Sequence, residues 1–172
     1  MIKYLLKKPL LIYRKCIQIF YTQKIKYQCK QYELPLRVNF KSSLTPHTTL
    51  HKNTNFNGMQ ISGKGKVEIG DNFHSGTNCQ IITQNHNYEG NKLPYDETYI
   101  YKDVIIEDNV WLGNNVIILG GITIGEGAIV QAGSVVVKSI EKYAIAGGHP
   151  CHPYKQRDIQ HYQLLKEQGA FF

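Results

Sequence analysis

In the second half of this chain an aliphatic side chain recurs at every sixth residue. The first positions of six consecutive hexapeptides are Ile106, Leu112, Ile118, Ile124, Val130 and Val136. The fifth positions are also restricted, to Val110, Val116, Ile122, Ala128, Ser134 and Ile140. A helix repeats every ~3.6 residues and a strand every ~2, so neither element alone produces this period.

A six-residue period predicts short parallel strands that are joined by tight corners, with three hexapeptides in each coil. The corners favour residues that tolerate unusual backbone dihedral angles. Such residues are Gly113, Asn114, Asn115, Gly120, Gly121, Gly125 and Gly127. Because each coil buries its apolar side chains only against the next coil, the chain is predicted to be an all-β solenoid, a parallel β-helix.

The period is interrupted after His86. It runs through residues 69–86 as IGDNFH, SGTNCQ and IITQNH, and more loosely through residues 50–61. Residues 87–103 then read NYEGNKLPYDETYIYKD, with no aliphatic rhythm and with many tyrosines and charges. We expect this segment to be a loop ejected from the scaffold, where binding and catalytic residues tend to lie.

The excess positive charge of the chain lies in its first 32 residues. This segment contains eight lysines and arginines and no acid, out of 20 basic and 13 acidic residues in the whole chain. The rest of the chain is therefore almost neutral. A neutral body argues against a nucleic-acid partner.

Residues 1–34 are expected to form a basic amphipathic arm, most of it a helix with Pro9 near its first turn. Its apolar residues at helical spacing are Ile2, Leu6, Leu10, Tyr13, Ile17 and Phe20. No apolar run is long enough to span a bilayer, and a signal-peptide cleavage site is lacking. Two interpretations stay open: the helix packs on the body or on a sister subunit, or residues 1–32 make a peripheral contact with an anionic membrane.

Three motifs resemble the hexapeptide-repeat acyltransferases, namely IGDN, WLGNNVIILGGITIGEGAIVQAGSVV and AGGHP. The resemblance covers about residues 50–157 and is strongest to sugar O-acetyltransferases of the maltose and galactoside type and to capsule-modifying enzymes. It implies a left-handed β-helix, which we place at residues 35–153, and a homotrimer with active sites between adjacent β-helices. The sequence of residues 154–172 suggests a short C-terminal helix that caps the end of the solenoid.

Acetyl transfer from a thioester to a hydroxyl needs a base for the hydroxyl proton, and imidazole groups titrate near neutral pH. His86 matches the histidine that plays this part in the resembled family. The resemblance also places Trp111 in the active cleft and makes the backbone N–H of Asn114 a candidate donor to the oxyanion. The residues expected to bind the acceptor are Asn55, Asn57, Asn85 and Tyr88.

Acetyl-CoA is the co-substrate that the resemblance implies. Its anionic end needs cations, and its long pantetheine arm needs a groove along the coils. The positions that match are Ala132, Gly133, Lys138, Gly148, Lys155 and Arg157. His152 departs from the pattern, because members of the family often carry Lys or Arg there.

The sequence thus predicts an acetyl-CoA-dependent O-acetyltransferase that acts directly on a hydroxyl of a sugar or surface glycan. Four cysteines without a CxxC pair predict a reducing compartment, hence the cytoplasm or the inner face of its membrane, and no metal is expected. Two alternatives remain, a xenobiotic (antibiotic) acetyltransferase and a non-catalytic β-helix binding module. A γ-class carbonic anhydrase is disfavoured, because its HxxxxH histidine pair is missing.

Overall fold

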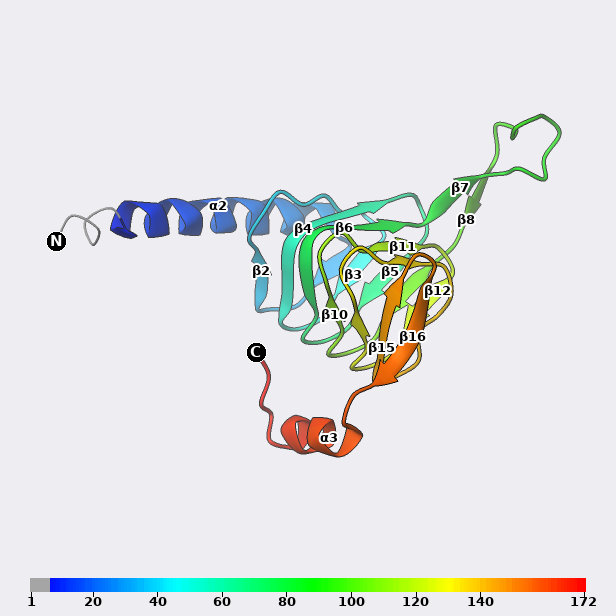
Figure 1. The fold of residues 1–172 in the computed structure, drawn as a ribbon. Coiled ribbons are helices and arrows are strands. Elements are labelled where there is room, and N and C mark those ends of the chain that lie inside the picture. The colour runs from blue at the N-terminus through cyan, green and yellow to red at the C-terminus, as the bar shows by residue number, and fades with distance from the viewer. Residues whose placement is uncertain (1–6) are drawn as a thin grey trace.

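The structure, a computed structural model, describes residues 7–172, with side chains from residue 11 onward. Ile2 and Leu6 of the predicted helical stripe lie outside the described residues. A helix, a stack of short strands and a second helix follow one another along the chain (Figure 1). The elements are α2 (Lys7–Gln28), β1 (Gln31–Tyr32), β2 (Leu36–Val38), β3 (Thr48–Leu50), β4 (Thr54–Ser62), β5 (Val67–Ile69), β6 (His74–Ile82), β7 (Gln84–His86), β8 (Tyr99–Tyr101), β9 (Val104–Ile106), β10 (Trp111–Leu112), β11 (Ile117–Leu119), β12 (Ile122–Ile124), β13 (Ile129–Val130), β14 (Val135–Val136), β15 (Ala144–Gly148), β16 (Cys151–Gln156) and α3 (Ile159–Glu167).

The strands form the predicted left-handed parallel β-helix. Val104 pairs with Ile122, and Trp111 pairs with Ile129, so neighbouring coils are offset by eighteen positions. Three hexapeptides therefore make one coil, as the period predicted. One face of the β-helix is the sheet β1-β3-β5-β9-β12. Within residues 7–172, the other faces are covered by a nine-stranded sheet, in which β4, β10 and β11 all pair with β6.

The repeated aliphatic positions form the core. All six first-position side chains, from Ile106 to Val136, are at most 1% exposed. The six fifth-position side chains, from Val110 to Ile140, are at most 5% exposed. Burial of apolar surface on this scale is the main favourable term in folding, at roughly 25 cal/mol per Å². The predicted core is confirmed.

Asparagines turn several corners and bond to one another from coil to coil. Asn53, Asn72 and Asn109 adopt φ values of 57°, 56° and 60°, a left-handed conformation that asparagine tolerates well. The Nδ2 of Asn53 donates to Asn72 Oδ1 at 2.9 Å, and Asn72 Nδ2 donates to Asn109 Oδ1 at 2.9 Å. Asn78 and Asn115 form the same pair at another corner. These contacts keep the coils in register.

The segment after β6 leaves the coil as an antiparallel hairpin of β7 and β8 (Figure 1). Trp111 pairs with His74 across a separation of 37 positions, so the extra residues all lie in this insertion. Residues 87–98 form its tip, and 99–101 are strand rather than loop. His86 thus stands inside the hairpin, and the last residue of the coil is the buried Thr83. The hairpin begins earlier than the lost rhythm suggested because Gln84–His86 bond to β8.

Helix α2 contacts the first coil through one side of its C-terminal half, and its N-terminal half projects away from the coils (Figure 1). Ile25 is fully buried, and the hydroxyl of Thr22 accepts a hydrogen bond from the Val38 N–H at 3.0 Å. Two residues of the predicted apolar stripe, Tyr13 and Phe20, are instead exposed by 62% and 66%. The apolar stripe that the sequence shows is therefore not the side of the helix that packs on the body.

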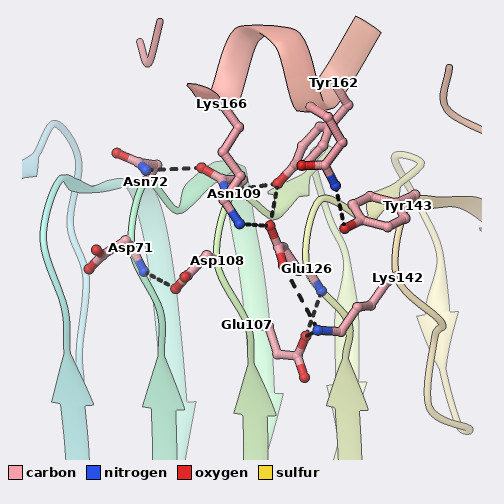
Figure 2. Close-up of polar contacts among 11 residues, drawn as sticks. Asp71, Asn72, Glu107, Asp108, Asn109, Glu126, Lys142, Tyr143, Tyr162 and Lys166 are labelled. Carbon is pink, nitrogen blue, oxygen red and sulfur yellow. Dashed lines mark hydrogen bonds and ion pairs between the residues drawn. The ribbon is translucent and has the colours of Figure 1, made fainter. Parts of the chain in front are cut away.

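Helix α3 is held on the coils by a polar network around Glu126 (Figure 2). The buried Tyr162 donates to Glu126 Oε1 at 3.0 Å and accepts from Asn109 Nδ2 at 2.8 Å. Lys166 pairs with the same carboxylate. Burial opposes ionisation of Glu126, but the hydrogen bonds from Lys166 and Tyr162 outweigh it and lower the pKa of this carboxyl.

Replacing the charge at the centre of this network is expected to loosen α3. Glu126→Gln should lower the free energy of unfolding by about 1–3 kcal/mol at neutral pH, since it leaves Lys166 and Tyr162 with a weaker partner. Because the folded pKa of Glu126 lies below the unfolded one, its contribution is lost as pH falls through the folded pKa. Urea titrations at neutral and acidic pH measure both effects. Glu141→Gln, at an exposed corner, is the control, and equal stability of wild type and Glu126→Gln at neutral pH would contradict the expectation.

Candidate active site

His86 closes strand β7 and lies among tyrosine rings of the hairpin. Its imidazole stacks on Tyr95, with ring centroids 3.9 Å apart and planes 17° apart, and Tyr99 lies 4.8 Å away. The neighbouring Asn85 and Tyr88, both expected to bind the acceptor, are exposed. Stacking fixes the plane of the His86 ring while its side chain stays open to solvent.

The tip of the hairpin is ordered by Asp96. Its carboxylate accepts hydrogen bonds from the backbone N–H of Thr98 at 2.8 Å and from that of Asn91 at 3.2 Å. The hydroxyl of Thr98 donates to the same carboxylate, and these bonds lower the pKa of Asp96. Because Tyr95 precedes Asp96 directly, the same bonds hold the ring that stacks on His86.

A groove of about 330 Å³ brings together three of the predicted residues. Trp111, Asn114 and Ala132 line it, with Tyr154 also in its wall. Its floor is one corner of the stack, where Gly113 lies so close to the next coil that a Cβ there would stand 2.5 Å from Ala132 N. Small residues therefore expose backbone at the bottom of the groove.

Asn114 presents a backbone donor beside this groove. Its Oδ1 accepts from the Thr77 N–H at 2.8 Å, and its carbonyl accepts from the Gly133 N–H at 2.8 Å. Its own N–H donates to no protein group within residues 7–172. A fixed backbone N–H without a partner is the kind of group that stabilises developing negative charge on an oxygen.

Asn55 and Asn57 belong to a polar cluster that also contains Asn39 and His74. Asn39 Nδ2 donates to Asn55 Oδ1 at 3.0 Å and to Asn57 Oδ1 at 2.8 Å. With its Oδ1 occupied, Asn57 turns its Nδ2 toward the Ser75 carbonyl at 2.8 Å and His74 Nε2 at 3.3 Å. His74 in turn pairs with both Asn55 and Trp111 across the sheet. His74 therefore lies next to Trp111 in the sheet, but the cluster itself lines other hollows. Asn55 and His74 line the pocket that Tyr162 and Phe172 also line, and Asn39 and Asn57 line the hollow beside α2.

The chain matches the family described as "Bacterial transferase hexapeptide (six repeats)" over residues 103–138. A galactoside O-acetyltransferase of Escherichia coli is 31% identical over 133 residues, which are 76% of this chain and 64% of that protein. A maltose O-acetyltransferase structure from Clostridium difficile is 31% identical with a TM-score of 0.54, covering 74% of this chain and 66% of that one. The chain belongs to the hexapeptide-repeat transferases.

Another member of the family was solved with its ligand. The hexapeptide-repeat acetyltransferase of Vibrio cholerae in complex with acetyl coenzyme A is 26% identical, with a TM-score of 0.52, covering 75% of this chain and 66% of that one. This chain spans less than two thirds of the length of the curated relatives that it matches.

The cationic residues expected to bind coenzyme A are not gathered at the groove. Lys138 and Lys155 are exposed, and Lys155 pairs with Ile145 of the groove wall. Gly148 has a φ of 100° at the end of β15. Arg157 donates to the Gly127 carbonyl at 3.0 Å, and its guanidinium lies 5.2 Å from the Tyr162 ring centre, so it helps to hold α3.

His86 and the groove lie at different edges of the β-helix in this hexapeptide-repeat protein. The hairpin leaves the coil after Thr83, at the corner that ends the face of β11. The groove instead runs from Trp111, on the face of β10, to Asn114 at the corner before β11. In the described chain no aromatic contact or hydrogen bond joins His86 to Trp111 or Asn114. One chain alone does not assemble the predicted site.

Sequence reasoning missed Asn39 and His74. Asn39 lies before the recognised hexapeptides, and His74 is the sixth residue of IGDNFH, a position that the period does not restrict. Asn55 and Asn57 lie in a coil that does not keep the eighteen-residue spacing. Leu50 pairs with Ile69 at nineteen positions, and a register shift between Asn55 and Asn57, beside Gly58 with a φ of 107°, adds one more. A glycine that breaks a strand pattern was the available signal.

His74 is expected to stay neutral to lower pH than an ordinary histidine. Burial lowers its pKa, and Asn57 donates toward its Nε2, which favours the form protonated on Nδ1. Because the folded pKa is the lower one, acidification through the unfolded value of about 6.5 reduces stability. An NMR titration that follows the ring nitrogens of His74, in the folded and in the urea-unfolded chain, measures the titration midpoint in each state. A folded midpoint at or above the unfolded one would refute the lowered pKa.

Proposed function

We propose that this chain is an acetyl-CoA-dependent O-acetyltransferase that transfers acetyl directly to a hydroxyl of a sugar or surface glycan. The observation that carries the proposal is the groove at the Gly113 corner. It gathers Trp111, Asn114 and Ala132 around an unpaired backbone N–H. Related proteins are named galactoside and maltose O-acetyltransferases, and one is solved with acetyl coenzyme A.

The groove fits an extended, narrow donor such as the pantetheine arm of acetyl-CoA. Its floor is backbone and its walls are the Trp111 and Tyr154 side chains, so a thin chain can lie against amide groups. Lys155 lies on the strand next to the Ile145 wall, where it offers positive charge to a phosphate. Acetyl-CoA supplies the thioester, and the protein supplies positioning and proton transfer.

His86 is the proposed general base. Its imidazole takes the proton of the acceptor hydroxyl as that oxygen bonds to the acetyl carbon, and the Asn114 N–H stabilises the negative charge on the carbonyl oxygen. When the carbon–sulfur bond breaks, the imidazolium returns its proton to the leaving thiolate. Free coenzyme A and the acetylated acceptor result, and His86 is again neutral.

A homotrimer would complete the site. His86 projects from one chain on a hairpin, and the groove lies at another edge of the same β-helix. In a ring of parallel β-helices, the hairpin of one chain can reach the groove of its neighbour. We infer that each active site uses His86 from one subunit and Trp111 from the next.

The acceptor is proposed to lie against the Asn55, Asn57 and His74 cluster, which offers amide groups for sugar hydroxyls and whose His74 neighbours Trp111 in the sheet. We propose that this reaction modifies a polysaccharide precursor in the cytoplasm. A xenobiotic hydroxyl is the competing acceptor, and the assay below separates the two.

The His86→Ala variant should lose transfer by about 10²–10⁴-fold, the usual contribution of a general base. Release of free thiol from acetyl-CoA measures this loss, with oligosaccharides, nucleotide sugars and hydroxyl-bearing antibiotics as acceptors. His161→Ala, an exposed histidine on α3, is the matched control and should keep full activity. Full transfer by His86→Ala to every accepted substrate would refute the assignment, and no transfer by wild type to any acceptor would favour a binding module.

Filling the groove should weaken donor binding. Ala132→Trp is expected to raise the KM for acetyl-CoA about tenfold or more, because crowding a packed site costs about 1–3 kcal/mol. The KM for the acceptor should change little. Gln160→Trp, which adds the same ring at an exposed position on α3, is the control. An unchanged KM for acetyl-CoA in Ala132→Trp would place the donor elsewhere.

A further inference from the structure

Helix α2 binds the body with polar as well as apolar side chains. Ile25 is part of the core, and Tyr21 and Cys29 pack against it. The Gln28 Oε1 accepts from the Leu44 N–H at 3.2 Å, and Gln18 donates to Asn39 Oδ1. With Thr22 and the buried Ile25, these residues follow one another at intervals of three and four, so they form a single side of the helix. The body therefore occupies this side of α2 and leaves the opposite side free.

The free side of α2 is apolar. Ile12, Ile19, Phe20 and Tyr27 are exposed by 65%, 53%, 66% and 89%, and the exposed Cys16 lies between them. Counted from Ile12, these residues stand at i, i+4, i+7, i+8 and i+15, which is one continuous stripe along the helix. We call these five residues the outer stripe. A stripe of large apolar side chains on the surface marks a contact with another apolar phase.

Cations border the outer stripe on both sides. Lys15 and Lys26 lie along one border and Lys24 along the other, from the helical spacing of these positions. No acidic residue occurs before Glu33 in the whole chain. An apolar stripe between rows of lysines is the pattern of helices that lie in the plane of an anionic membrane surface.

We propose that α2 docks this protein on an anionic lipid bilayer through the outer stripe and its flanking lysines. Among the described residues, no helix is long and apolar enough to cross a membrane, so α2 would lie along the surface. Charge decides between lipid and a second copy of the chain. The body is almost neutral, with 12 basic and 13 acidic residues after residue 32. Its clustered acids, Glu68, Asp71, Glu107, Asp108 and Glu126, line a polar hollow with His51 and Lys142, which does not match a broad apolar stripe, whereas an anionic bilayer offers both negative charge and an apolar interior.

The test is co-sedimentation of the full chain with vesicles of phosphatidylcholine, with and without phosphatidylglycerol. Wild type should bind the anionic vesicles, and binding should weaken with salt. The double variant Ile19→Glu, Phe20→Glu should bind the anionic vesicles at least about tenfold more weakly than wild type, because two carboxylates enter the apolar stripe. Leu164→Glu, at an exposed leucine of α3, is the matched control and should bind like wild type.

A second variant tests the charges without touching the stripe. Lys15→Gln with Lys24→Gln should weaken binding about fivefold for each lysine removed, from about 1 kcal/mol per cation near the surface. Lys64→Gln, an exposed lysine of the body, should have no effect. Vesicle binding does not require acetyl transfer, so this proposal and the proposed function fail separately.

Two results would overturn the proposal: absence of wild-type binding to anionic vesicles, or equal binding by wild type and the Ile19→Glu, Phe20→Glu variant. If equal binding comes with a change in the oligomeric mass of that variant by light scattering, the outer stripe is an interface between copies. Far-UV circular dichroism confirms that each variant is folded.

Discussion

The structure depends on the stacking of aliphatic side chains along the axis of the β-helix. Each inward residue, such as Ile118, has its equivalents one coil above and below and is shielded from water on every side. The backbone of each coil bonds only to the neighbouring coils, so the regular part of the stack keeps the eighteen-residue spacing. A single extra residue is absorbed within the first coils, where Leu50 pairs with Ile69, but an insertion as long as the hairpin has to leave the stack, and chemistry that needs varied side chains is placed there.

This constraint explains where the candidate site lies. The insertion at residues 84–101 leaves at a corner and pairs with itself, which satisfies its backbone without disturbing the coils. The groove lies at a corner too, where Gly113 allows close stacking and Asn114 keeps a free N–H. Because corners of one β-helix point away from each other, such a scaffold favours sites that form between subunits.

The features of the fold that recur in every coil could be predicted from the sequence, whereas contacts that occur only once could not. The inward positions and the presence of an ejected segment near His86 could be read from a period, because every coil imposes the same requirement on them. The point at which the chain leaves the coil, after Thr83 rather than His86, could not, because it depends on the pairing of Gln84–His86 with β8. The Asn39–Asn57–His74 cluster could not, since its members come from three different coils and make contacts that occur once. The groove residues Trp111, Asn114 and Ala132 came from a family resemblance, and the free N–H of Asn114 needed coordinates.

The orientation of α2 follows from the same physics. The end of a β-helix exposes backbone N–H groups that have no further coil to bond to. Thr22 and Gln28 accept from two such groups, those of Val38 and Leu44. A helix that caps this end therefore needs polar atoms on its inner side, where, within the described part of the helix, only Ile25, Tyr21 and Cys29 pack against the core. Other apolar residues, such as Ile19 and Phe20, are left on the outside. Apolar spacing alone would orient α2 the other way, with Phe20 against the body. The outer stripe is thus a consequence of capping the first coil, and it makes this end of the solenoid suited to a second, apolar contact.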